Sequence, residues 1–144
     1  MRAFMKFNLG LLAMSLHLQT WVLLLISVNI ITPFFFLEHV EAQVVLAAGA
    51  LGMVLMTALT ARFGFSRIIG VGHIAWLPLL GFLWTRLPDV PATDAFGLWL
   101  RAVIMLDAIS LGFDALDVVR FLRGDRAETV LDLQPPFEAI GSQA

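Results

Sequence analysis

The sequence contains no cysteine and no tyrosine among its 144 residues, and only 14% of the residues are charged. Without cysteine the chain forms no disulfide, no thiolate metal site and no cysteine nucleophile, and the redox compartment stays unspecified. The formal net charge is −2, so the basic excess that is typical of nucleic-acid-binding proteins is missing. We therefore expect no nucleic acid partner.

Apolar residues make up 60% of the chain, and the mean hydropathy is +0.90. Typical soluble domains contain about 45–50% apolar and about 25% charged residues. A water-soluble fold of this composition would have too little polar surface to cover itself. The composition therefore predicts an integral membrane protein whose first partner is the lipid bilayer.

Four apolar runs are long enough to cross a membrane, at about 17–37, 42–61, 68–84 and 98–119. A helix needs about 20 residues to span a hydrocarbon core of about 30 Å, and the runs lack the alternation of strands. We predict an all-α membrane protein: an up-down-up-down bundle of four transmembrane helices within 1–120, followed by a short cytoplasmic tail at 121–144. Because no cleavage motif follows its basic start, the first run reads as an uncleaved signal-anchor.

The connections between these runs are short. Segments 38–41 and 62–67 predict tight antiparallel hairpins. The third connection, 85–96, is longer, and either Thr93 or Asp94 is expected to cap the last helix.

Glycine and proline predict local geometry within this bundle. Gly64 suits a positive φ at the second turn, and the Ala48-xxx-Gly52 spacing favours close helix packing. Pro78 predicts a kink in the third helix that frees a carbonyl near Ile74.

Basic residues predict the orientation. Seven of them would share one side of the bundle: Arg2, Lys6, Arg62, Arg67, Arg120, Arg123 and Arg126. Only Arg86 and Arg101 fall on the other side. The positive-inside rule then places both termini in the cytoplasm, in a multi-pass protein of a bacterial-type inner membrane. We expect Arg62, Arg67, Arg120, Arg123 and Arg126 to contact lipid headgroups, and Trp84 and Trp99 to form an outer aromatic belt.

Polar residues inside the predicted spans are the candidate functional residues, because carboxylates in hydrocarbon are costly. Asp107, Ser110, Asp114 and Asp117 fall within an arc of about 80° on the last helix. Depth counted along the helices predicts two layers. The midplane layer contains Asn29, Ser27, Asp107 and Ser110. The inner layer contains His73, Thr57, Asp114 and His17.

Three interpretations of these carboxylates stay open. In the first they hydrogen-bond between helices, Asp107 to Asn29 or Ser27, and Asp114 to His73 and Thr57. In the second, the two carboxylates and His73 form a proton or cation path. In the third, the stripe on the last helix docks against a larger membrane complex.

Cofactor and catalytic motifs are scarce in this sequence. His17 and His73 are weak candidates for the axial ligands of a haem, and we expect no metal site. No GxGxxG, P-loop, HExxH or GxSxG motif occurs, so we assign no catalytic residue and lean against an enzyme. The leading hypothesis is an accessory or interaction subunit of a larger membrane assembly. The alternative is a homo-oligomeric transporter or channel that uses Asp107 and Asp114 with His73.

Overall fold

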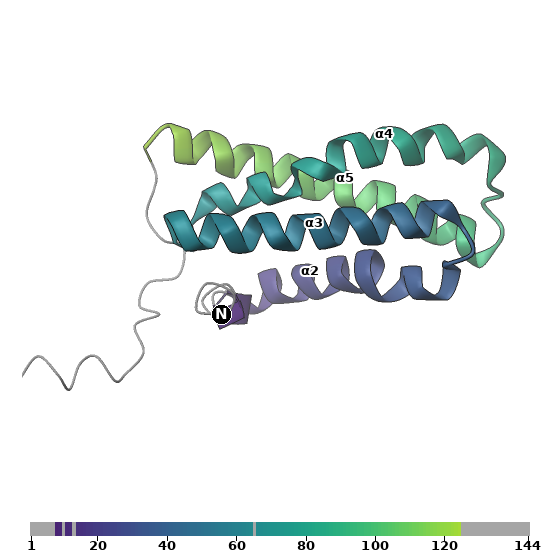
Figure 1. Ribbon diagram of the computed structural model, residues 1–144, viewed down its shortest axis with the longest axis horizontal. Coiled ribbons are helices and arrows are strands. Elements are labelled where there is room, and N and C mark those ends of the chain that lie inside the picture. The colour runs from purple at the N-terminus through teal and green to yellow at the C-terminus, as the bar shows by residue number, and fades with distance from the viewer. Residues whose placement is uncertain (1–7, 10, 13, 65, 125–144) are drawn as a thin grey trace, which may run out of the picture.

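In the computed structural model, residues 8–9, 11–12, 14–64 and 66–124 are described, and their regular structure is helical apart from one isolated bridge residue. Four long helical segments lie along the long axis of the molecule (Figure 1). Three of them are long and apolar enough to cross a membrane: Leu16–Phe36, Val40–Phe63 and Arg67–Asp89. They coincide with the first three predicted runs, and the all-helical, membrane-type fold is confirmed.

The first segment changes its helical geometry along its length. It consists of α2 (Leu16–Ile26), a π-helical turn η1 (Ser27–Ile31) and a 3₁₀ turn η2 (Thr32–Phe36). Pro33 lacks the N–H that a continuous α-helix would require, so the backbone must rearrange before it. The Thr32 hydroxyl donates to the Ser27 carbonyl at 2.8 Å across the widened turn. The Val28 carbonyl of this turn accepts a hydrogen bond from another helix, from the Trp99 indole.

The second segment is one unbroken helix, α3 (Val40–Phe63), which ends at Gly64 with φ of 71°, as the glycine predicted. The third segment is composite: η3 (Arg67–Ala75) is a 3₁₀ helix, α4 (Trp76–Arg86) is α-helical, and η4 (Leu87–Asp89) is a short 3₁₀ turn.

The proline in the third segment lies where an α-helix tolerates it. Pro78 is the third residue of α4, in its first turn, where an α-helix tolerates proline best. The departure from α geometry therefore precedes the proline and covers all of η3, whereas the sequence predicted a local kink. A 3₁₀ helix rises about 2.0 Å per residue instead of about 1.5 Å, so η3 lengthens the third segment by about 4 Å.

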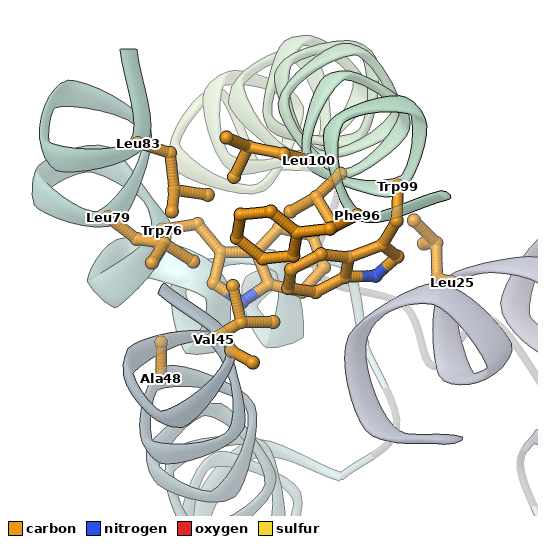
Figure 2. Packing of buried hydrophobic residues seen from close by; sticks show 11 residues of the cluster. Leu25, Val45, Ala48, Trp76, Leu79, Leu83, Phe96, Trp99 and Leu100 are labelled. Atoms are coloured by element: carbon orange, nitrogen blue, oxygen red, sulfur yellow. The ribbon is translucent and has the colours of Figure 1, made fainter. Parts of the chain in front are cut away.

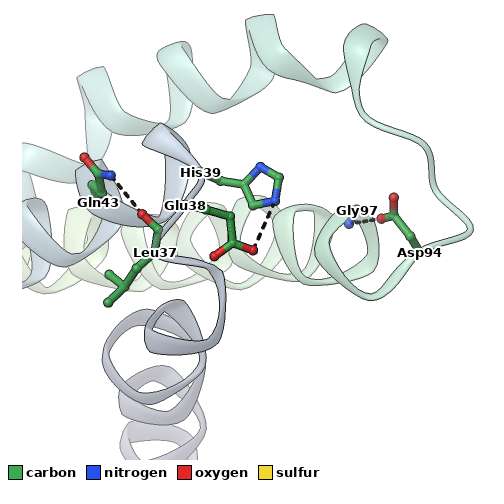
Figure 3. A network of polar contacts seen from close by, with 6 residues as sticks. All are labelled: Leu37, Glu38, His39, Gln43, Asp94 and Gly97. Atoms are coloured by element: carbon green, nitrogen blue, oxygen red, sulfur yellow. Dashed lines mark hydrogen bonds and ion pairs between the residues drawn. The ribbon is translucent and has the colours of Figure 1, made fainter.

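The fourth segment is α5 (Ala95–Leu122), whose 28 residues extend about 42 Å. Asp94 caps its N-terminus, where the carboxylate accepts a hydrogen bond from the Gly97 N–H at 2.6 Å (Figure 3). Arg101 donates to the carbonyls of Val90 and Gly97, both at 3.0 Å, and so ties the preceding loop to the helix. The helix is longer at both ends than the predicted 98–119.

The turn between η2 and α3 is joined to the start of α5. Gln43 donates to the Leu37 carbonyl at 2.8 Å, and His39 lies 3.7 Å from Glu38 (Figure 3). The His39 ring stacks on Phe96 with 3.7 Å between ring centroids. These contacts fix the first hairpin against the fourth segment at this end of the bundle, which we call the 38–41 end.

The apolar core fills the half of the bundle near the 38–41 end. Trp76, Phe96 and Trp99 lie at its centre, surrounded by aliphatic side chains from the four long segments (Figure 2). Trp99 is only 6% exposed, so it belongs to the core and not to the predicted aromatic belt, whereas Trp84 is 66% exposed. The opposite half, toward the 62–67 end, contains the polar groups described next.

A polar interior beside an apolar cavity

Asp107 is completely buried, and its partner is Asn29. The Asn29 amide donates to Asp107 Oδ1 at 2.8 Å, and Asn29 lies in the π-helical turn η1. Ser27, the other predicted partner, instead donates to the Leu23 carbonyl of its own helix. The Trp99 indole N–H donates to the Val28 carbonyl of the same turn at 2.9 Å. Two side chains of α5 therefore hold η1.

This buried pair is only partly satisfied. Asp107 Oδ2 and Asn29 Oδ1 are both inaccessible and have no hydrogen-bond partner. Buried polar atoms in folded proteins are nearly always paired, because an unpaired one costs about 1–3 kcal/mol. The Asn29–Asp107 contact thus combines a strong interhelical bond with unused acceptor capacity.

The second intramembrane pair joins His73 of η3 to Asp114 of α5, with 2.7 Å between Nδ1 and Oδ2. Which of the two groups donates depends on the tautomer of the imidazole. The imidazole also stacks on Trp76 at 4.1 Å. Among the described residues nothing hydrogen-bonds to Nε2. The ring is therefore held in one orientation with one nitrogen unused.

The 3₁₀ geometry of η3 explains why this pair forms. Three residues per turn align Arg67, Gly70, His73 and Trp76 in one row, whereas in an α-helix each step of three would rotate by about 60°. A Cβ on Gly70 would lie 2.9 Å from Asp114 Oδ1 and 3.2 Å from its Cα. The missing side chain lets η3 approach α5 closely enough for the histidine to reach the carboxylate.

Asp117 lies one turn beyond Asp114 and binds Arg67 at 2.8 Å, also from η3. Arg120, which is three residues from Asp117 on the same helix, is 3.9 Å away. Helical spacing alone favours Arg120, three residues on, as the partner of Asp117, and the sequence analysis placed Arg67 among the headgroup contacts. In the structure Arg67 is the nearer partner of Asp117, because the alignment of every third residue along η3 places Arg67 directly opposite α5.

The other predicted headgroup residues remain on the surface or lie beyond the described residues. Arg62 lies over the Phe63 ring at 5.7 Å and is exposed, as is Arg123. Arg126 and the tail from residue 125 onward lie outside the described part of the chain.

Some predicted site residues are not brought together. Thr57 forms no hydrogen bond with Asp114, and the buried threonine of this helix is Thr60, which donates to the Met56 carbonyl of α3. His17 is exposed on α2 and is not among the residues that line the cavity beside His73. Among the described residues, no three histidine or acidic side chains converge as a metal site.

A cavity of about 670 Å³ lies beside these pairs, bounded by α2, η1, α3, η3 and α5. Most of its lining is apolar. The polar residues of its lining include Asn29, His73, Ser110 and Asp114. Arg67, Asp117 and Arg120 border it toward the 62–67 end, whereas Asp107 does not line it. The cavity therefore reaches the partner of Asp107 but not Asp107 itself.

One ion pair was missed by the sequence analysis. Glu41, only 3% exposed as a residue, binds Arg86 at 2.6 Å between Oε1 and Nε and links α3 to α4 at the 38–41 end. The available signal was that two opposite charges flank two successive spans at the same end of the bundle. Because the two residues are 45 positions apart in the chain, no helical spacing rule relates them.

Comparison with protein-family models, curated protein sequences and solved structures gave no significant match to this chain. Its function is therefore inferred from its own residues and geometry.

Proposed function

We propose that this chain is a four-span protein of a bacterial-type inner membrane with both termini in the cytoplasm. The proposal treats α5 as a fourth membrane span, in addition to the three apolar segments named above. Support comes from the placement of its acids: Asp107, Asp114 and Asp117 have partners on η1 and η3. The surface left exposed on α5 is largely apolar, as at Met105, Phe113 and Leu116.

The charges at the two ends support the orientation. Arg86 is paired with Glu41, and Arg101 is bound to backbone carbonyls, so both arginines at the 38–41 end are occupied within the chain. The opposite end presents Arg62, Arg120 and Arg123 on the surface. Cytoplasmic ends of membrane proteins carry such an excess of exposed lysine and arginine.

Within this membrane we infer an accessory or interaction role in a larger assembly. The observation that carries it is the Asn29–Asp107 bond: the most deeply buried acid is held by a neighbouring helix and does not border the cavity. A buried carboxylate in this position is suited to a structural hydrogen bond between two helices rather than to a path for protons or cations. Polar contacts of this kind in membranes contribute about 0.6–2 kcal/mol each and fix the register of apolar helices. The lipid-exposed faces are then the surfaces available to partner subunits.

The test is extraction of the full chain in a mild detergent followed by native electrophoresis and identification of co-migrating subunits. A photo-crosslinking residue at exposed Leu77, and separately at exposed Phe35, should capture a distinct membrane protein in cells. A monomer that yields no crosslink at either position would contradict the accessory role.

The second candidate is a small homo-oligomeric transporter or channel. The specific observation in its favour is that Asn29 and the His73–Asp114 pair border the same cavity, so polar groups at two depths share one space. Proton or cation flux into proteoliposomes containing the purified chain tests it. Flux that Asp107→Asn abolishes would favour this candidate over the accessory role.

A further inference from the structure

We propose that the cavity between α2 and η3 binds a neutral lipid with one long apolar chain and a hydroxyl-bearing head. In this site His73 Nε2 accepts a hydrogen bond from the head. The inference goes beyond the accessory role and requires only that the cavity lies within the bilayer.

The size and lining of the cavity indicate a long apolar chain. Its volume of about 670 Å³ lies within the range of about 300–1,000 Å³ that is typical of small-molecule sites. Leu25 and Ile26 of α2, Met53 and Met56 of α3, and Leu116 of α5 contribute to the walls. Methionine side chains adapt to irregular apolar ligands because they are unbranched and flexible.

The position of α2 gives a lipid a way in from the side. Among the described residues η1, rather than α2, makes the close backbone contacts with α3 and α5. α2 itself lies at the edge of the bundle (Figure 1). There the Trp21 ring packs edge-to-face against the Phe113 ring, with 6.4 Å between ring centroids. The space between α2 and the bundle is therefore bounded by side chains and not by close backbone contacts, and the proposal takes this side as the route of entry from the bilayer.

The chemistry of His73 indicates the head group. The proposal assigns the tautomer in which Nδ1 donates to Asp114 and Nε2 keeps a lone pair that accepts a hydrogen bond. The Trp76 ring covers the imidazole, and a Cβ on Gly52 would lie 4.0 Å from His73 Cδ2. An oriented acceptor at the wall of an apolar cavity matches a hydroxyl donor on the ligand.

The charge balance of the lining favours a neutral head over an anionic one. Two arginines, Arg67 and Arg120, border the cavity together with two aspartates, Asp114 and Asp117. These formal charges cancel, and Arg67 already binds Asp117 at 2.8 Å. A phosphate or carboxylate head would therefore gain no net attraction from this lining.

The experiment measures equilibrium binding of two radiolabelled probes to the full chain in lipid nanodiscs: farnesol, an isoprenoid alcohol, and decylhydroquinone. Their methyl ethers, which keep the chain but lack the hydroxyl donor, serve as matched ligands. We expect at least one hydroxyl probe to bind, and its ether to bind about tenfold more weakly, as the loss of one hydrogen bond predicts. The stronger probe identifies the ligand as an isoprenoid alcohol or a quinol.

Variants link this binding to the cavity. His73→Phe keeps a ring against Trp76 but removes Nε2, and should abolish the preference for hydroxyl over ether. His73→Phe alone leaves the Asp114 carboxylate without its partner. If that variant does not fold, the double variant His73→Phe/Asp114→Leu replaces it in the binding measurement, because it removes the carboxylate as well. Met53→Trp should block both probes by filling the cavity. Met105→Trp, at an exposed position of α5 outside the cavity, is the matched control and should bind normally.

Three results would overturn the proposal: no binding of either hydroxyl probe, equal binding of probes and ethers, or displacement of both probes by phosphatidylglycerol at its bilayer concentration. The last result would identify the cavity as a place for ordinary bilayer lipid. These outcomes are separate from the accessory role, because co-migration of partner subunits is measured independently of the His73 variants.

Discussion

Asp107 shows how a single side chain is accommodated in an apolar bundle. The carboxylate is fully buried, yet one amide from a π-helical turn is its only hydrogen-bond partner among the described residues. Removing one partner of such a bond leaves the other buried and unpaired, which costs more than the bond itself contributes.

We predict that Asp107→Asn keeps the fold, because an amide oxygen still accepts the Asn29 hydrogen bond. Asp107→Leu should lower the stability by about 1–3 kcal/mol, because it leaves the Asn29 amide without an acceptor. Thermal unfolding in detergent measures both changes. Equal stability of Asp107→Leu and the unaltered chain would show that the side chain is not enclosed between the helices.

The His73–Asp114 pair predicts energetic coupling between η3 and α5. Each of His73→Ala and Asp114→Ala should destabilise the chain, and the double variant should cost less than the sum, with a coupling of about 0.5–3 kcal/mol. A double-mutant cycle in detergent unfolding measures it. The same cycle for His39 and Asp114, which lie in different parts of the bundle, is the control and should be additive. Additivity at His73 and Asp114 would contradict the contact.

At the scale of elements, η3 is the feature that positions the site. A nine-residue 3₁₀ helix is long for its kind, since runs beyond about four residues are uncommon. Two glycines let it pack tightly: Gly70 toward Asp114 and Gly72 toward Met56. The tight packing compensates for the poorer hydrogen-bond geometry of the 3₁₀ backbone.

We predict that Gly72→Ala destabilises the chain by about 1–3 kcal/mol, as overpacking does elsewhere. A Cβ there would collide with Met56 Cγ and lie 3.2 Å from the Met56 backbone nitrogen. Gly81→Ala is the matched control, because nothing lies within 4 Å of the corresponding Cβ. It should leave stability unchanged or raise it slightly, since alanine favours helix. A cost at Gly81 equal to that at Gly72 would contradict the close approach of η3 and α3.

At the scale of the whole molecule, the distribution of polar groups divides the bundle into two halves. The 38–41 end is filled by aromatic and aliphatic side chains and closed by the Glu41–Arg86 pair. The 62–67 half contains the cavity and the ion pairs of η3 with α5. Any ligand chemistry is therefore expected in the second half.

The proposed topology predicts the outcome of reporter fusions. A fusion after Arg123 should report the cytoplasm, and an insertion between Val90 and Asp94 should report the opposite side. The physical reason is the excess of exposed arginine at the 62–67 end. A cytoplasmic signal at both sites would exclude a fourth span, and reversed signals would exclude the orientation.

The sequence by itself determined the helical, membrane-type class and the positions of the apolar segments, because run length and composition are properties of each helix taken alone. It also indicated the contacts of Asp107 with Asn29 and of His73 with Asp114, since depth in a bundle follows from counting residues along each helix. These inferences required no knowledge of which helix faces meet.

The tertiary structure decided the rest. The 3₁₀ helix η3 and the bonds of Arg67 with Asp117 and of Glu41 with Arg86 follow from packing between segments distant in the chain. Backbone geometry at these places is a compromise between local hydrogen bonding and close approach to a neighbouring helix. Local sequence propensity describes only the local hydrogen bonding. The close approach to a neighbouring helix depends on contacts that form only when the helices pack together.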